Sequence, residues 1–106
     1  MSPLDALAPD QRLVVALLLR PGTSYDDVAG ILGIPVEAVR ARANAGLAAL
    51  GPDTALPAEV TGPLADYLLQ QQSASDAAAT RRLLEESAPA RAWSAGVAEA
   101  LAPTAP

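Results

Sequence analysis

The sequence predicts an all-α fold. Apolar residues make up 51% of its 106 residues, and they recur at helical spacing rather than alternating as in a strand. Proline-glycine pairs at Pro21-Gly22 and Gly51-Pro52 divide the chain into short segments with clear ends. The chain has no Phe and is rich in Ala, which favours helix and occupies little volume. We therefore expect short helices that pack closely.

The first half is expected to begin with a short helix at Pro3 and a second helix over about residues 9–19. The apolar stripe that should bury this second helix consists of Leu13, Val14, Leu17 and Leu18. Ser24 and Asp27 then form a capping box, in which each side chain binds a free amide at the start of the next helix. That helix is expected to end at Leu32, because Gly33 tolerates the left-handed backbone that ends helices. A further helix should run over residues 35–50.

Residues 24–49 have the pattern of a helix-turn-helix. This motif needs a small residue where its helices cross, a residue tolerant of positive φ in the turn, and apolar residues on both sides. Ala29, Gly33 and Val39 meet these demands at suitable spacing. The alternative is an ordinary helical hairpin that carries Gly in its turn.

The second half predicts three more helices. Pro63 starts or restarts one, Ser73 and Asp76 form a second capping box that opens a helix to about Glu86, and the last runs over about residues 89–101. The predicted fold is therefore a small helical bundle containing a helix-turn-helix, followed by a packed three-helix extension. The predicted divisions are residues 1–51 for the helix-turn-helix head, 52–101 for an acidic extension, and 102–106 for a frayed tail or linker.

The composition excludes several kinds of chemistry. Without Cys or His, the chain has no thiol nucleophile, disulfide or common transition-metal ligand, so we expect no metal and no cofactor. The polar residues are accounted for by caps, turns and exposed faces, so no enzyme is predicted. The longest apolar run, residues 13–19, is too short to span a bilayer, and no secretory signal is recognisable. We expect a soluble cytoplasmic protein.

Five segments of the first half carry a family resemblance: residues 7–12, 17–20, 24–29, 32–35 and 39–42. Together they resemble region four of bacterial sigma factors over about residues 4–50. The resemblance implies promoter binding through the helix over residues 35–50 and contact with RNA polymerase. It also implies that Glu37, Ala38, Arg40 and Ala41 face the major groove, with Arg42 and Asn44 nearer the DNA backbone.

The charge departs from that family pattern. Members usually continue the recognition helix with more basic residues, whereas here Asn44 and Gly46 stand among alanines. The net charge is −5, and residues 51–106 hold three Arg against seven acidic residues. Because DNA affinity comes largely from cations that displace counterions at phosphates, we expect DNA binding to be weak. The chain also lacks a region-two domain, so a complete sigma factor is not expected.

The second half resembles the helices of anti-sigma domains more distantly, over residues 65–69, 77–84 and 88–93. In the zinc-binding members of that group, two Cys flank a Pro-Ala pair. Here Ala88 and Arg91 stand at those places, which excludes the metal. The alternative is an extension that only completes the core, with Tyr67 and Trp93 as packing residues.

Two functions remain open on the sequence. One is a transcription-related module that binds DNA through residues 35–50, with Arg40, Arg42 and also Arg12 and Arg20 as candidate contacts. The other is a protein-interaction module that has kept the scaffold and lost DNA binding, with a second copy of the chain or another protein as partner. An outward face at Glu37, Arg40, Ala41 and Asn44 that is exposed and positive in potential would favour the first function. A face that is buried against the second half would favour the second.

Overall fold

The computed structural model describes residues 3–52 and 56–102, which are helical and contain no strand. A 3-10 helix, η1, spans Pro3–Ala6, and six α-helices follow. They are α1 (Pro9–Leu18), α2 (Tyr25–Leu32), α3 (Val36–Leu50), α4 (Ala58–Leu68), α5 (Ala74–Glu86) and α6 (Ala88–Leu101). The predicted all-α class is therefore confirmed. Of the predicted tail, residues 103–106 lie outside the described residues.

The local signals around α2 act as predicted. The Ser24 hydroxyl accepts a hydrogen bond from the Asp27 amide at 3.1 Å, and the Asp27 carboxylate accepts one from the Ser24 amide at 3.0 Å. Gly33 ends α2 with φ 67°, in the left-handed region that a side chain disfavours. Its amide donates to the Ala29 carbonyl at 2.9 Å, so the turn into α3 is fixed by backbone bonding.

Three local predictions differ from the structure. Helix α4 begins at Ala58 and continues through Pro63, although proline cannot donate the amide bond to the turn before it. At the start of α5, Ser73 accepts a bond from the Asp76 amide, and the described contacts do not include the reciprocal half of the predicted box. In α1 the buried face contains Val15, which packs towards Gly46 of α3, while Leu13 is 47% exposed.

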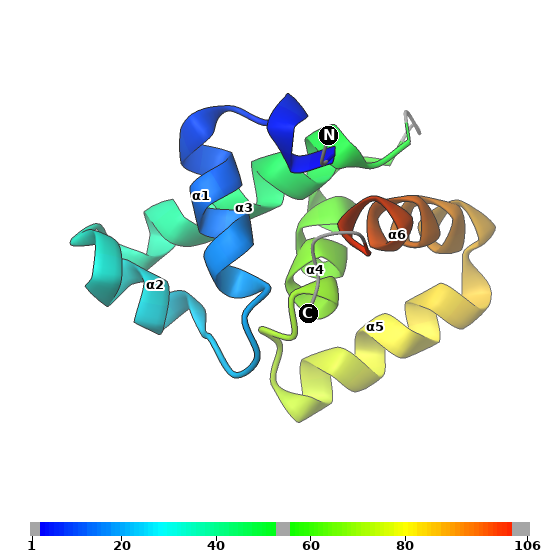
Figure 1. Ribbon diagram of the computed structural model, residues 1–106. Coiled ribbons are helices and arrows are strands. Elements are labelled where there is room, and N and C mark those ends of the chain that lie inside the picture. Colours follow the sequence, from blue (N-terminus) through cyan, green and yellow to red (C-terminus); the bar gives the residue numbers. More distant parts are fainter. Residues whose placement is uncertain (1–2, 53–55, 103–106) are drawn as a thin grey trace.

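The helices share one hydrophobic core. Helix α3 packs against α1 and α2 on one side and against α4 on the other, and α4 in turn contacts α6 (Figure 1). Fully buried side chains come from both halves of the chain, among them Val28, Val39, Leu47, Leu64 and Val97. Trp93 and Leu101 are also buried, so they lie with Val97 on the inward face of α6.

Two glycines allow neighbouring helices of this core to approach closely. A Cβ on Gly46 would lie 3.1 Å from Cγ2 of Val15, which places α1 directly against α3. A Cβ on Gly51 would lie 2.5 Å from Nε1 of Trp93, which seats the indole against the end of α3. Gly46, which weakens α3 by propensity, thus allows the close contact with Val15.

Candidate nucleic-acid interface

The outward face of α3 is a row of four exposed residues, which we call the α3 ridge: Glu37, Ala41, Ala45 and Ala48. They recur three or four residues apart, the spacing of one helix face. The opposite face, with Val39 and Leu47, is fully buried. The α3 ridge is thus open, but its one charged group is a carboxylate.

Arg40 lies on the side of α3 that faces α4, and Asp66 of α4 holds its guanidinium. Nε and Nη2 of Arg40 donate to the same Asp66 oxygen, Oδ2, at 3.0 Å and 2.7 Å. The Asp66 side chain is 9% exposed and that of Arg40 is 54% exposed. The hydrogen bond and charge of Asp66 raise the pKa of Arg40 above its usual value, so the cation is fixed in its charged form.

The other oxygen of Asp66 binds the start of α2. The hydroxyl of Tyr25 donates to Oδ1 at 2.5 Å. Burial raises the pKa of Tyr25 well above its usual range, and the hydrogen bond to Asp66 and the charge of Asp66 raise it further. Gln71 completes this contact, because its Oε1 accepts from the Tyr25 amide and its Nε2 donates to the Thr23 carbonyl, each at 2.9 Å. We call Tyr25, Arg40, Asp66 and Gln71 the Asp66 cluster.

Arg42 lies on the other side of α3 and meets an acid from α1. Its Nε is 3.6 Å from Oδ2 of Asp10, with 38% and 54% of the two side chains exposed. Arg12 forms a similar exposed pair with Asp5 at 3.6 Å. Exposed pairs at this distance contribute little to stability and are easily exchanged for other partners. The ion pair of Arg42 is therefore looser than that of Arg40, although the Arg42 side chain is the less exposed of the two.

Asn44 is half-buried beside α4. Its Oδ1 is buried and has no hydrogen-bond partner among the described residues. Its Nδ2 is 3.8 Å from where a Cβ on Gly62 would be, so the amide lies against the α4 backbone rather than on the α3 ridge. Of the sequence-predicted contacts, the structure thus leaves Glu37, Arg40 and Ala41 exposed, and half-buries Arg42, Asn44 and Ala38.

The first half thus combines a capped helix, a left-handed glycine turn and an exposed helix supported on two others. Residues 4–50 match the family model of sigma-70, region 4. The matched residues begin within η1 and end with the last residue of α3. No match to the chain was found among curated proteins or among solved structures.

The region 4 match stops before the residue that holds Arg40. Asp66 and Gln71 belong to the second half, so one arginine of the matched residues is bound by a segment outside the match. The sequence analysis missed Asp66, Tyr25 and Gln71 as site residues. One signal was present, since Asp66 stands among apolar residues of a helix, where a buried carboxylate needs a partner. The distant anti-sigma resemblance of this half stays a prediction.

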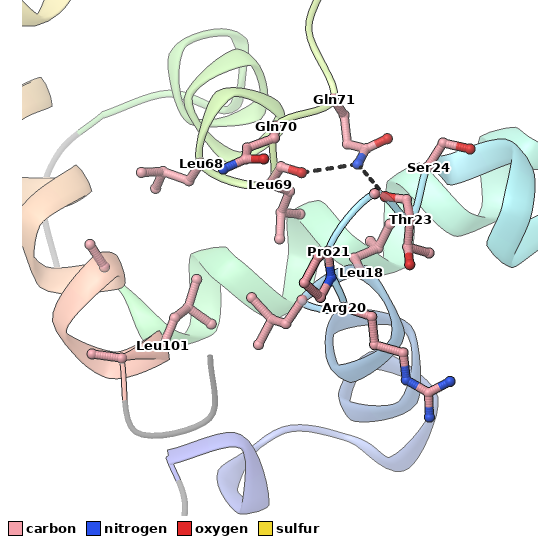
Figure 2. Close-up of a pocket in the computed structure, with 14 residues that line it drawn as sticks. Leu18, Arg20, Pro21, Thr23, Ser24, Leu68, Leu69, Gln70, Gln71 and Leu101 are labelled. Atoms are coloured by element: carbon pink, nitrogen blue, oxygen red, sulfur yellow. Dashed lines mark hydrogen bonds between the residues drawn. The ribbon is translucent and has the colours of Figure 1, made fainter. Parts of the chain in front are cut away.

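An open groove of about 520 Å³ lies where the α1–α2 turn meets the ends of α4 and α6 (Figure 2). Leu18, Leu69 and Leu101 line it, and Gln71 crosses one side with hydrogen bonds to Thr23 and Leu69. Arg20 lies at its rim with its guanidinium directed away from the leucines. The groove marks a junction between the two halves of the chain.

Among residues 3–52 and 56–102, no group of three or more acidic residues is placed to hold a metal ion. No helix in the described part of the chain is long and apolar enough to cross a membrane.

Proposed function

We propose that this chain is a transcription-related module that binds duplex DNA weakly through α3. The observation that carries the proposal is that Glu37, Arg40 and Ala41 remain exposed although the second half is packed beside them. A covered face would have favoured a protein-interaction module instead. In this proposal residues 1–51 form the DNA-binding head, residues 52–101 support and restrain it, and the chain has no enzymatic activity.

The side chains of α3 suit a shallow contact in the major groove. Glu37 can accept a hydrogen bond from a cytosine amino group, and the methyl group of Ala41 can pack against that of a thymine. Arg42 and Arg40 flank the α3 ridge, where they would bind phosphates or a guanine edge once their carboxylate partners are displaced. Asn44 would lie nearer the DNA backbone, and RNA polymerase is the further partner that the region 4 match suggests.

The small number of cations limits the affinity. Each phosphate neutralised on duplex DNA contributes about −0.9 to the slope of log affinity against log salt. Two arginines on α3 therefore predict a slope of about −2, which is shallow for a DNA-binding protein, and the net charge of −5 opposes the approach of DNA. Binding should be measurable only at low salt.

Fluorescence anisotropy with a labelled pool of random-sequence duplexes, at about 20 mM salt, tests the proposal. The double variant Arg40→Ala with Arg42→Ala should lose binding. Arg81→Ala with Arg82→Ala is the matched control, since it changes the net charge equally in exposed positions of α5 and should retain most of the affinity. If no duplex binds the wild type at low salt, or if both double variants weaken binding equally, the proposal is wrong.

One observation supports the second function, an interaction module. Apart from Glu37, the α3 ridge consists of alanines, and small side chains allow another helix to approach closely. In that case α3 would pack against a second copy of the chain. Sedimentation velocity over a wide concentration range separates the two functions, because a dimer that Ala45→Glu dissociates, with no DNA affinity, would favour the interaction module.

A further inference from the structure

We propose that Asp66 is an internal competitor for DNA, a carboxylate that occupies Arg40 in place of a phosphate and lowers the affinity of α3. This inference rests on the proposed DNA binding and adds the regulation of the same site. The second half of the chain supplies the competitor, since Asp66 lies outside the region 4 match. DNA binding then requires the Arg40 guanidinium to exchange one anion for another.

The geometry of the pair suits such an exchange. Arg40 gives two donors to one oxygen of Asp66, at 2.7 Å and 3.0 Å, which is a charge-assisted contact of the strong kind. The carboxylate is 9% exposed, whereas more than half of the Arg40 side chain remains open to solvent. The fixed partner is thus the buried acid, and the movable partner is the arginine at the surface, where DNA would arrive.

The Asp66 cluster keeps the acid in place when the arginine leaves. Tyr25 donates to Oδ1, the oxygen that Arg40 does not use, and the Gln71 amide donates to the Asp66 carbonyl at 2.8 Å. Release of Arg40 therefore needs no unfolding of α4. It does leave a buried carboxylate without its cation, which is unfavourable and opposes release.

A second acid also opposes the binding of a phosphate by Arg40. Asp76, in the first turn of α5, lines the same surface groove as Arg40 and Asp66. The two carboxylates therefore repel a phosphate that approaches this groove. By contrast, the Asp10 carboxylate beside Arg42 is 54% exposed and lies 3.6 Å away, so water and salt weaken its hold. Asp66 therefore restrains Arg40, whereas Asp10 holds Arg42 only weakly.

The test removes the charge of the Asp66 side chain and keeps its shape. With the random-sequence duplex pool, Asp66→Asn should bind about tenfold more tightly than the wild type. Its salt slope should stay near the wild-type value, because Arg40 contacts the same phosphate in both complexes. Glu86→Gln, an equal change of charge at an exposed position of α5, is the matched control and should change neither quantity appreciably. Adding Arg40→Gln to Asp66→Asn should abolish the gain.

Tyr25→Phe separates charge competition from loosening of α4. It removes a hydrogen bond of the Asp66 cluster but keeps the Asp66 charge and its pair with Arg40, so the affinity should stay close to that of the wild type. An equal gain in Tyr25→Phe and Asp66→Asn would overturn the proposal. So would wild-type affinity in a folded Asp66→Asn, although DNA binding itself would then stand. No binding by any variant would instead remove the proposed function.

A measurement on the unmodified chain covers the case in which Asp66→Asn fails to fold. The Nε–H resonance of Arg40 should exchange slowly with water in the free protein, because Asp66 accepts that proton. On addition of duplex DNA, this resonance and the side-chain carboxyl carbon of Asp66 should both shift. If both stay unchanged at saturating duplex, Arg40 does not exchange its partner and the proposal is wrong.

Discussion

Single residues at the start of α2 set the geometry of the helix-turn-helix. Ser24 satisfies the Asp27 amide, and Ser24→Ala leaves that donor without a protein partner, so we expect a loss of about 1 kcal/mol in the free energy of unfolding. Urea denaturation followed by circular dichroism measures this loss. Ser75→Ala, at an exposed position in the first turn of α5, should change it by less than about 0.5 kcal/mol. Equal losses would contradict the role of the cap.

Asp27 gives the same cap a dependence on pH. Hydrogen bonds from the backbone amide and then the hydroxyl of Ser24 lower the pKa of the Asp27 carboxyl below its usual value. A carboxyl whose pKa is lower in the folded state stabilises the fold above its unfolded pKa, and that contribution is lost as the pH falls towards the folded value. Asp27→Asn keeps an acceptor and does not titrate. The stability difference between wild type and Asp27→Asn should therefore shrink below about pH 4 in urea titrations. A constant difference would contradict this linkage.

Among the elements, α2 and α6 each contain a glycine in a very different setting. A Cβ on Gly30 of α2 meets nothing within 4 Å, whereas one on Gly96 of α6 would lie 2.6 Å from Cδ of Pro52. Gly30→Ala should therefore gain about 0.5–1 kcal/mol from helix propensity. Gly96→Ala should lose about 1–3 kcal/mol, because the clash with the proline ring outweighs that gain. Thermal unfolding of the two variants checks the pair, and stabilisation by both would show that α6 can shift away from Pro52.

The bounds of the elements were largely predictable because the residues that end them act locally. Ser24 and Gly33 determine the limits of α2 through bonds to atoms within a few positions along the chain. The start of α4 was not predictable in this way, because Pro63 suggests a helix start but lies inside the helix. There the carbonyl of Pro63 accepts a hydrogen bond from the Gln72 side chain. The buried face of α1 also depends on a distant residue, because Gly46 of α3 admits Val15.

At the scale of the whole molecule, the shared core predicts that both halves unfold together. Trp93, the one tryptophan of the chain, is buried in α6 beside the end of α3 and reports on the junction. Its fluorescence and far-ultraviolet circular dichroism should give coincident urea transitions. Leu64→Ala, at a fully buried position of α4, should lower the free energy of unfolding by about 2–5 kcal/mol by both probes. Transitions that separate would instead show that the halves unfold independently.

The sequence by itself determined that the chain is helical, that Ser24 begins and Gly33 ends the first helix of a helix-turn-helix, and that cations are scarce. Each of these follows from composition or from contacts between near neighbours in the chain. Only the tertiary structure decided what the arginines of α3 contact. Asp66 is 26 positions from Arg40 and 41 from Tyr25, and it meets both because α4 folds back against α3 and the start of α2. Packing between distant segments creates that contact, and no local pattern encodes it.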